Sequence, residues 1–345
     1  MSPSYDVLLV DLDGTVYRGQ EAVPGAVEAL EAARDRGVAV SYVTNNASRS
    51  PGTVQEHLAD LGLTLVEDDV VTSAQAAAAL LAQRCSPGDA VLVLGTDALA
   101  DEVDAVGLRP VRAASDEPVA VVQGHSPQTG WEHLAEATVA LAAGASWIAC
   151  NVDPTLPSDR GMLPGNGSMI AALRMTTGRE PDVAGKPAAP LLQQAIERVG
   201  ARHPLVVGDR LDTDIAGASA VGADSLLVLS GVATAAEVLT APSGQRPTFL
   251  AADLGVLGSD DGALDAARVD ASGTGWTVTV DDGVATLSRD GEDDDEPDAL
   301  AALRALCGPA WKYLDGQDER ADAVTVRPDG ESAERVVDTL DLPRA

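Results

Sequence analysis

Aromatic residues are scarce in this sequence of 345 residues. Phe, Trp and Tyr together make up 3%, although hydrophobic residues reach 45%. Its cores must therefore consist mainly of Ala, Val and Leu. Cysteine is also rare, and Cys85, Cys150 and Cys307 are widely spaced with no CxxC pair. An odd, scattered set favours neither a disulfide framework nor a zinc site, so we expect reduced thiols.

Long apolar runs and positive charge are lacking too. No run reaches membrane-spanning length, and the first residues show no basic segment followed by an apolar one, so we expect a cytoplasmic protein. Lysine occurs only as Lys186 and Lys312, and the formal net charge is −31. This charge disfavours nucleic acids and anionic membranes as partners. An anionic substrate would need a local metal or cation, because the overall field repels it.

What the sequence does contain is a buried strand that ends in two carboxylates. Residues 7–10 are apolar, and Asp11, Asp13 and Gly14 follow directly. The carboxyl end of such a strand is where open α/β sheets bind their ligands. Two converging carboxylates repel each other unless a cation joins them, so Mg²⁺ is the expected third component. The alternative is an acidic loop without a ligand, which is common in a chain so rich in Asp.

Polar residues also follow the next predicted strand, residues 38–43. Thr44, Asn45 and Asn46 lie between this strand and a predicted helix over residues 51–61. A hydroxyl and two amides at that position suit an anion such as phosphate. They are equally ordinary turn and N-cap residues.

Two further stretches add charged residues. Lys186 precedes Pro187, which we expect to begin a helix over residues 188–199, so this rare lysine would lie beside a positive helix end. A surface lysine is the alternative. Asp209 follows the predicted strand 205–208 as Asp11 follows its own, and could complete the carboxylate set of a metal.

Between these stretches the chain predicts a second α/β domain, inserted before the first is complete. Its helices are expected at 76–84, 97–105 and 131–144, and its strands at 90–94, 119–123 and 147–150. A polar loop rich in Gly and Pro, Asn151 to Ser168, then leads to a helix over 169–177. Strands at 223–229 and 247–249 would close the first domain near Leu257.

Taken in order, four stretches resemble the motifs of the haloacid dehalogenase (HAD) superfamily. They are Asp11-Leu12-Asp13-Gly14-Thr15, Thr44-Asn45-Asn46, Gly185-Lys186-Pro187 and Gly208-Asp209-Arg210-Leu211-Asp212-Thr213-Asp214. The position of the inserted domain is similar to that of subfamily IIA phosphatases with a large α/β (C2-type) cap. The resemblance implies an α/β fold: a Rossmann-like core with a parallel sheet over 1–74 and 185–258, a cap over 75–184, and a separate tail over 259–345. Two departures lie in the cap, at Cys150 and at Gly124-His125-Ser126.

The resemblance also implies a mechanism. Asp11 would attack phosphorus and form an aspartyl-phosphate, and Asp13 would protonate the leaving alkoxide and then activate water. Mg²⁺ would be held by Asp11, the backbone carbonyl of Asp13, and Asp209.

The other two motifs would bind the phosphate itself. Thr44, the backbone amide of Asn45, and Lys186 would hold the phosphoryl oxygens. Asn46 and Asp214 would support these groups, with Asp214 orienting Lys186 or a metal-bound water.

The cap would exclude water and recognise the rest of the substrate. Asp153 and Arg160, in the loop from Asn151 to Ser168, are the main candidates for substrate contacts. Trp131 and His125 are weaker candidates, because a Trp at the start of a helix more often serves packing.

The tail predicts a small α+β module. Residues 276–280 and 284–288 alternate around Asp281-Asp282-Gly283, which indicates a β-hairpin. An acidic linker (290–296), a helix (298–306), a strand (323–326) and a helix (332–340) are expected to follow. Some bacterial glycerol-3-phosphate phosphatases of this subfamily carry a similar piece that resembles part of the N-acetyltransferase (GNAT) fold. The tail lacks an Arg/Gln-x-x-Gly-x-Gly/Ala stretch, so we expect it to pack against the core or to form a homodimer contact.

These patterns favour a Mg²⁺-dependent phosphomonoester hydrolase whose partner is a small-molecule phosphate ester. On resemblance, glycerol 3-phosphate from lipid recycling is the leading substrate. Phosphoglycolate, sugar phosphates, pyridoxal phosphate and a broad p-nitrophenyl phosphate-type activity compete, although few aromatics in the cap loop disfavour the pyridoxal ring. A non-catalytic metabolite-binding scaffold that works through its tail is the alternative from another class.

Overall fold

The computed structural model describes residues 5–66, 68–158, 160–258, 262–269, 275–290, 297–317 and 324–345. The chain forms two compact units. The first comprises residues 1–40 and 202–345, and the second comprises residues 41–201. The four-part division predicted from the sequence, with its cap over 75–184, stays a prediction.

The first unit contains a parallel sheet with the strand order β15-β14-β13-β1. Its strands are short and apolar, so both faces of the sheet can be covered by helices. The strands are β1 (Val7–Val10), β13 (Pro204–Gly208), β14 (Asp224–Val228) and β15 (Phe249–Ala251). The same unit includes the hairpin of β2 (Tyr17–Arg18) and β3 (Glu21–Ala22), and the helices α1 (Ala26–Asp35), α8 (Ala216–Val221), α9 (Ala235–Leu239), α10 (Gly255–Gly258) and α11 (Ala263–Ala266).

The second unit begins within β4 (Ala39–Thr44), which pairs in parallel with β5 (Val70–Thr72). Its helices include α2 (Pro51–Asp60), α3 (Ser73–Arg84) and α7 (Ala189–Val199). α3 starts three residues earlier than predicted, because Thr72 and Gln75 form a capping box that fixes its first turn.

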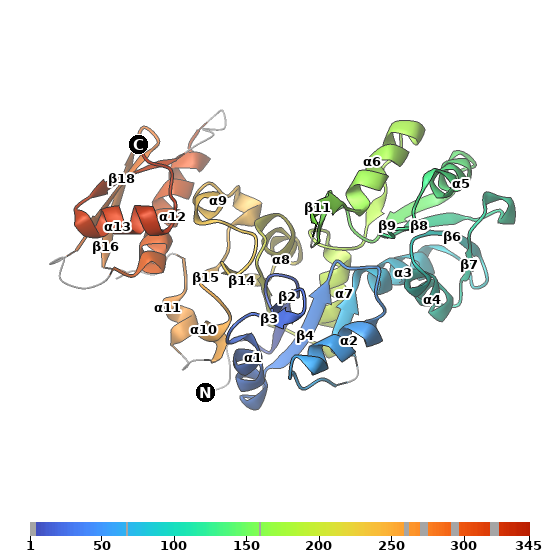
Figure 1. Ribbon diagram of the computed structural model, residues 1–345, viewed down its shortest axis with the longest axis horizontal. Helices are drawn as coiled ribbons and strands as arrows, with labels where there is room; N and C mark the ends of the chain where they lie inside the picture. Colours follow the sequence, from blue (N-terminus) through green and yellow to red (C-terminus); the bar gives the residue numbers. More distant parts are fainter. Residues whose placement is uncertain are drawn as a thin grey trace. The chain divides into compact units, whose positions relative to one another are not determined.

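A second parallel sheet lies in this unit, in the order β12-β9-β8-β6-β7. The strands are β6 (Ala90–Leu94), β7 (Arg109–Val111), β8 (Ala120–Gln123), β9 (Ser146–Ala149) and β12 (Asp182–Val183). Helices α5 (Trp131–Ala142) and α6 (Asn166–Thr177) cover one face, and α3 and α4 (Asp97–Ala105) lie on the other (Figure 1). The predicted second α/β sheet is therefore present.

The loop predicted from Asn151 to Ser168 is partly wrong. It contains an antiparallel hairpin, β10 (Thr155–Ser158) and β11 (Gly161–Pro164). The helix expected from Met169 already begins at Asn166. The Gly and Pro residues that suggested a loop therefore lie within and beside short strands, where pairing between the two strands outweighs their low strand preference.

The C-terminal module, which we define as the described residues from 275 to 345, has a three-stranded sheet. β16 (Trp276–Asp281) and β17 (Val284–Arg289) form the predicted hairpin, and both turn residues, Asp282 and Gly283, have positive φ. β18 (Thr325–Asp329) pairs in parallel with β17. It starts two residues later than predicted, and Ala323 and residues 291–296 of the predicted linker lie outside the described residues.

Two helices complete the module, α12 (Ala299–Asp315) and α13 (Glu331–Thr339). The prediction that α12 would end at Leu306 is wrong. The helix continues through Pro309, because packing of its apolar face, which includes Leu303, Leu306 and Ala310, outweighs the cost of an internal proline.

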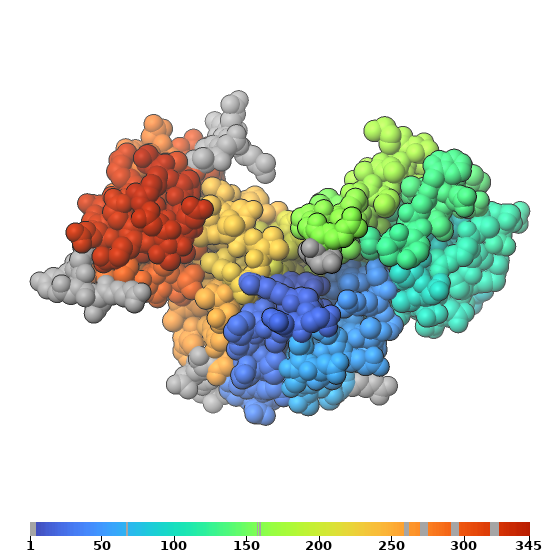
Figure 2. Space-filling model, viewed as in Figure 1, coloured from blue at the N-terminus to red at the C-terminus, as the bar shows by residue number. Residues whose placement is uncertain are grey.

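The module shares one apolar cluster with the core of the first unit. Side chains of α9 and β14 belong to the same buried cluster as those of α12, α13 and β17. Figure 2 shows the module's red atoms against the yellow atoms of the core. The prediction that the tail packs against the core is confirmed. In the described part of the chain, no helix combines the length and the apolar character of a membrane span.

Candidate active site

The first motif lies where β1 ends. All four residues of β1 are buried, and the Asp11 N–H donates to the Val207 carbonyl at 2.8 Å, so the strand pairing extends to Asp11. Asp11 is half-buried, whereas Asp13 is exposed. The chain thus presents Asp11 at the end of the sheet and Asp13 at the surface beside it.

Gly14 is required after these carboxylates for two reasons. Its φ of +89° is in the left-handed region, which favours glycine. A Cβ at this position would also overlap the Asp209 carboxylate. Its carbonyl accepts a hydrogen bond from the Ser230 hydroxyl at 2.9 Å, so Gly14 links the first motif to the chain that follows β14.

Asp209 is fully buried at the end of β13 and is surrounded by hydrogen-bond donors. The Val232 N–H donates to Asp209 Oδ2 at 2.7 Å, and the Thr15 hydroxyl donates to Oδ1 at 3.4 Å. The Ala233 N–H donates to the Asp209 carbonyl at 3.0 Å. These donors fix the orientation of the carboxylate and offset part of the cost of its burial.

Asp11, Asp209 and Asp214 form a group of carboxylates in the first unit. One oxygen of each lies within 4.8 Å of the others, and both Asp209 and Asp214 are buried. Hard carboxylate oxygens are the ligands that Mg²⁺ prefers, and a cation would relieve their mutual repulsion. The residues therefore fit a divalent metal, and the supporting role predicted for Asp214 stays a prediction.

Asp214 reaches this position through an unusual backbone. Residues 211–215 form a π-helical segment, and the Arg210 N–H donates to Asp214 Oδ2 at 3.1 Å. A π-helical turn is rare and is often found at functional sites. Gly208 allows the approach, because a Cβ there would overlap the Asp214 side chain.

Asp212, in the fourth motif, forms an ion pair with Arg210. Two hydrogen bonds join it to the Arg210 guanidinium, at 3.0 and 2.8 Å. Burial opposes ionisation of this carboxyl, but the bonds from Arg210 hold its pKa below the ordinary value. Asp212 is thus a partner of Arg210.

The second and third motifs meet in the second unit through Asn45. Its side-chain oxygen accepts from the Lys186 N–H at 2.8 Å, and its side-chain nitrogen donates to the Lys186 carbonyl at 2.9 Å. Gly185 permits this approach, because a Cβ there would lie 2.5 Å from Asn45 Oδ1. The Asn45 side chain therefore holds the Lys186 backbone from both directions.

Lys186 itself is buried, and its ammonium donates to the Val43 carbonyl at 3.3 Å. The surface-lysine alternative is therefore wrong. The prediction that Pro187 begins the next helix is also wrong: α7 starts at Ala189, with Pro190 in its first turn. Proline fits the first turn of a helix equally well at either position, and the sequence contains both.

Thr44 and Asn46 form a compact turn after β4. The Asn46 N–H donates to the Thr44 hydroxyl at 3.0 Å, and the Ser48 N–H donates to the Asn46 side-chain oxygen at 2.8 Å. Thr44 is buried. These bonds confirm the turn alternative for this stretch, and its role as a phosphate site stays a prediction.

The cap loop reaches the same residues. The side chains of Ser73 and Asn151 both donate to the Asn45 carbonyl, at 2.6 and 2.7 Å. Asp153 accepts from the Asn45 side-chain nitrogen at 3.3 Å. Asp153 thus lies beside Asn45 of the second motif, and its predicted contact with substrate stays a prediction.

His125 lies on another part of the second unit that touches the second motif. Its carbonyl accepts from the Ser48 hydroxyl at 2.8 Å. Burial lowers the pKa of its half-buried imidazole, so the neutral ring is favoured. This places His125 next to the turn that follows Asn46.

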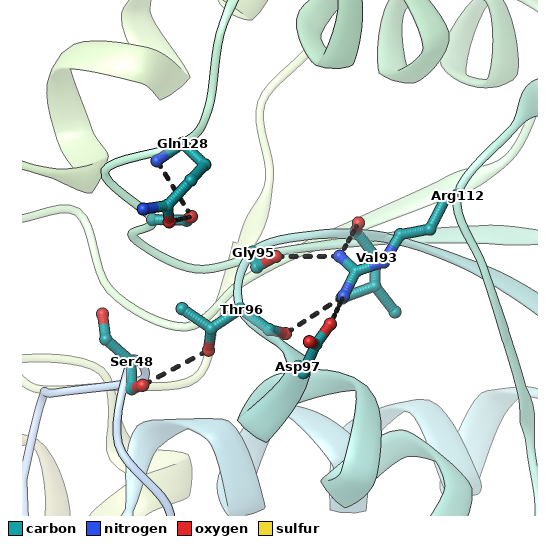
Figure 3. A network of polar contacts seen from close by, with 8 residues as sticks. Ser48, Val93, Gly95, Thr96, Asp97, Arg112 and Gln128 are labelled. Carbon is teal, nitrogen blue, oxygen red and sulfur yellow. Dashed lines mark hydrogen bonds and ion pairs between the residues drawn. The ribbon is translucent and has the colours of Figure 1, made fainter.

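A network after β6 reinforces this contact (Figure 3). The Arg112 guanidinium donates to the carbonyls of Val93 and Gly95, both at 2.8 Å, and to Asp97 at 2.8 Å. The Thr96 hydroxyl donates to the Ser48 carbonyl at 3.4 Å. Arg112 therefore holds the turn between β6 and α4 against the chain that follows Asn46.

Trp131 and Arg160 take no part in the hydrogen bonds described above. Trp131 is 80% exposed at the start of α5, so the packing role considered from the sequence is wrong. Arg160 is exposed in the turn of the β10–β11 hairpin, where its N–H donates to the Ser158 hydroxyl at 3.1 Å. Their predicted contacts with substrate stay predictions.

The sequence reasoning missed the loop between β14 and α9. Residues 229–234 supply the Ser230 hydroxyl and the Val232 and Ala233 N–H groups described above. A signal was available, because Ser230 and Gly231 directly follow a predicted strand, as the motif residues do. Backbone donors are hard to predict from a sequence, because every residue except proline has a backbone N–H group.

Comparisons with known proteins agree with this geometry. The family model of haloacid dehalogenase-like hydrolases matches residues 8–109, and a related HAD-hydrolase-like model matches residues 183–257. A GCN5-related N-acetyltransferase like domain matches residues 274–342.

Individual relatives cover most or nearly all of the chain. A D-glycerol 3-phosphate phosphatase of Mycobacterium tuberculosis is 49% identical over 95% of this chain and 95% of its own. An acid sugar phosphatase of Staphylococcus saprophyticus is 36% identical over 73% of this chain and 96% of its own.

A solved structure is similar throughout. The crystal structure of a glycerol phosphate phosphatase from Mycobacterium tuberculosis in complex with magnesium has a TM-score of 0.88 and 48% identity, and covers 98% of each chain. The ordered motifs, the carboxylate group and these similarities together show that the chain belongs to the haloacid dehalogenase-like hydrolases.

Proposed function

We propose that this chain is a Mg²⁺-dependent phosphatase that hydrolyses glycerol 3-phosphate to glycerol and inorganic phosphate. The observation that carries the proposal is the carboxylate group of Asp11, Asp209 and Asp214, of which Asp209 and Asp214 are buried. It occurs in a chain that is 49% identical over 95% of its length to a D-glycerol 3-phosphate phosphatase.

Asp11, Asp209 and the backbone carbonyl of Asp13 would hold the metal. Asp214 would hold a metal-bound water or complete the ligand set. When bound, Mg²⁺ neutralises and positions the phosphate. The Val232 N–H and the Thr15 hydroxyl keep the Asp209 carboxylate oriented for this role.

The chemistry is assigned to the two aspartates of the first motif. The Asp11 carboxylate attacks phosphorus, forms an aspartyl-phosphate and displaces the alkoxide of glycerol. Asp13 donates a proton to that alkoxide, and its carboxylate then takes a proton from the water that hydrolyses the aspartyl-phosphate. The exposed position of Asp13 suits a group that exchanges protons with substrate and water.

Phosphate binding is assigned to Thr44, the backbone amide of Asn45, and Lys186. A buried ammonium is costly unless it meets negative charge, which supports an anion-binding role for Lys186. Its contribution is greatest where charge spreads over the phosphoryl oxygens in the transition state.

Recognition of the glycerol part is assigned to the cap, which we place at residues 75–184. Asp153, Arg160, Trp131 and His125 are the proposed contacts. The reaction is further proposed to take place in the cytoplasm and to recover glycerol from lipid head groups. A homodimer stays a prediction.

Phosphate release with Mg²⁺ tests the proposal across both enantiomers of glycerol 3-phosphate, phosphoglycolate, pyridoxal phosphate, a sugar phosphate and p-nitrophenyl phosphate. We expect the highest kcat/KM for glycerol 3-phosphate, with the D enantiomer preferred. A flat profile would replace this substrate with a broad phosphatase activity. No release from any ester would refute the enzyme and leave the scaffold alternative.

A further inference from the structure

The C-terminal module is an addition to the hydrolase. The hydrolase family models end at residue 257, and the acid sugar phosphatase matches 73% of this chain with 96% of its own length. A phosphatase of this family therefore does not need such a module in general. Its contacts in the first unit indicate what it does in this chain.

One of these contacts is made by Trp311 on α12. Its indole N–H donates to the Val238 carbonyl of α9 at 3.0 Å, across the boundary between module and core. α9 has only five residues, so it has little stability of its own and depends on tertiary contacts.

Arg246 strengthens the same contact. Its guanidinium carbon lies 5.3 Å from the centre of the Trp311 ring, within the range of a cation–π interaction. It also forms two hydrogen bonds of 2.7 Å with Asp315, at the end of α12. A third bond, from its Nε to the Ala241 carbonyl at 3.0 Å, ties the segment after α9 to the same group.

The apolar side of α9 is buried by the module as well. Ala235, Val238 and Leu239 belong to the same cluster as Leu303 and Leu306 of α12. The position of α9 therefore depends on α12 through both apolar packing and directed hydrogen bonds.

The loop that α9 anchors is the one that orients Asp209. Thr234 caps α9, and Val232 and Ala233, immediately before it, donate to the carboxylate and carbonyl of Asp209. Gly231 lies so close that a Cβ would overlap the same carboxylate. A small displacement of α9 would thus change the hydrogen bonds of a proposed metal ligand.

We propose that the C-terminal module is a buttress for the metal site, and that Trp311 is a positioning residue that fixes α9, the loop 229–234 and the Asp209 carboxylate. The inference rests on the proposed function only in taking Mg²⁺ as the ligand of Asp209. It gives the module a role in metal affinity and requires no transferase activity.

Trp311→Phe tests this proposal in the full chain, because it keeps a ring for packing and removes the N–H donor. The measurement is the Mg²⁺ dissociation constant from isothermal titration calorimetry, without substrate. Loss of one such bond predicts a dissociation constant about threefold to tenfold higher. At saturating Mg²⁺, kcat should return close to the unchanged protein's value.

Arg304→Gln is the matched control. Arg304 is also on α12 and also bonds across to the core, but to the Ala266 carbonyl at the end of α11, away from the metal-site loop. It should lower the melting temperature without changing the Mg²⁺ dissociation constant. Asp315→Asn, which weakens the hold on Arg246, replaces Trp311→Phe if that variant does not fold.

The proposal is overturned if Trp311→Phe and Asp315→Asn melt earlier, as Arg304→Gln does, yet bind Mg²⁺ like the unchanged chain. It is also overturned if the unchanged chain binds no Mg²⁺. If Mg²⁺ binds and no ester is hydrolysed, the proposed function fails, and the three dissociation constants still decide the role of the module.

Discussion

At the scale of single residues, the carboxylate group depends on glycines whose missing Cβ leaves room for side chains. Gly14 and Gly231 both face the Asp209 carboxylate, and Gly208 faces Asp214. A buried carboxylate cannot move aside without losing its donors, so these positions tolerate no added atom.

Gly231→Ala should therefore disable the metal site. The added methyl group would overlap the Asp209 carboxylate, and the displaced side chain would lose its bond from Val232. We expect Mg²⁺ affinity to fall by at least about tenfold, and stability to fall by about 1–3 kcal/mol. Calorimetric titration with Mg²⁺ and chemical denaturation would measure both.

Gly244→Ala is the control for this change, because a Cβ there meets no heavy atom within 4 Å. It should bind Mg²⁺ normally. Equal Mg²⁺ affinities for the two variants would contradict the assigned geometry.

A second prediction at this scale concerns Asn45. Asn45→Asp keeps an acceptor for the Lys186 N–H but removes the donor to the Lys186 carbonyl and places a second carboxylate beside Asp153. We expect a loss of about 1–3 kcal/mol in stability and a clear fall in kcat/KM as Lys186 shifts.

Asn46→Asp adds the same charge one residue later. The Asn46 side-chain oxygen accepts from the Ser48 N–H, and the carboxylate of this variant can accept the same hydrogen bond. Denaturation midpoints and steady-state kinetics of the two variants should differ strongly. Similar losses in both would show that added charge alone, and not the Asn45–Lys186 contact, matters.

The sequence predicted the site residues that act through side chains in recognisable motifs. The structure brings Asp11, Asp209 and Asp214 together in the first unit, and Asn45 and Lys186 in the second. It did not predict that the Asn45 side chain would hold the Lys186 backbone. It also did not predict the donors of residues 229–234, because any residue except proline supplies a backbone N–H.

At the scale of elements, helix α12 shows that tertiary packing can outweigh local sequence preferences for ending a helix. The sequence predicted an end at Leu306, yet the helix continues past Gly308 and Pro309 to Asp315. Its last turns carry Trp311 and Asp315, which contact α9 and Arg246. The longer helix therefore adds two further residues that join the module to the core.

This contact predicts a pH dependence. The hydrogen bond from Arg246 holds the pKa of Asp315 below its ordinary value. The stabilisation is therefore fully present above that ordinary value, at about 4, and is lost as the pH falls below it. Asp315→Asn should melt at a lower temperature than the unchanged protein at pH 7, and the difference should shrink near pH 3.5.

Thermal denaturation followed by circular dichroism at the two pH values is the measurement. Asp290→Asn, at an exposed position in the same module, controls for the loss of one negative charge. A difference that stays constant or widens at low pH would show that the Arg246–Asp315 pair does not stabilise the fold.

At the scale of the whole molecule, the order of strand and helix patterns along the chain predicted two α/β sheets and a small added module, and each is present. Alternating buried strands and amphipathic helices produce a strong local signal. The hairpin of β10 and β11 produced no such signal, because its short strands include Gly and Pro and are stabilised by pairing with each other. The predicted ends of helices and strands were wrong mainly where a helix cap or a contact with a distant part of the chain determined them.

The net charge of −31 gives a prediction at the same scale. Repulsion between like charges destabilises the compact state, and salt screens it. Raising KCl from 0.05 to 1 M should increase the melting temperature by at least about 2 °C in scanning calorimetry. Sucrose of equal osmolarity controls for solute exclusion, and a fall with KCl would contradict the argument.

The most direct test of the central claim compares phosphate release from glycerol 3-phosphate by the unchanged chain and by Asp11→Asn, at saturating Mg²⁺. Removal of the nucleophile should lower kcat by at least about 10³-fold, while Asp60→Asn, at an exposed position on α2, should keep the full rate. If Asp11→Asn releases phosphate as fast as the unchanged chain, the assignment of Asp11 and the mechanism built on it are wrong.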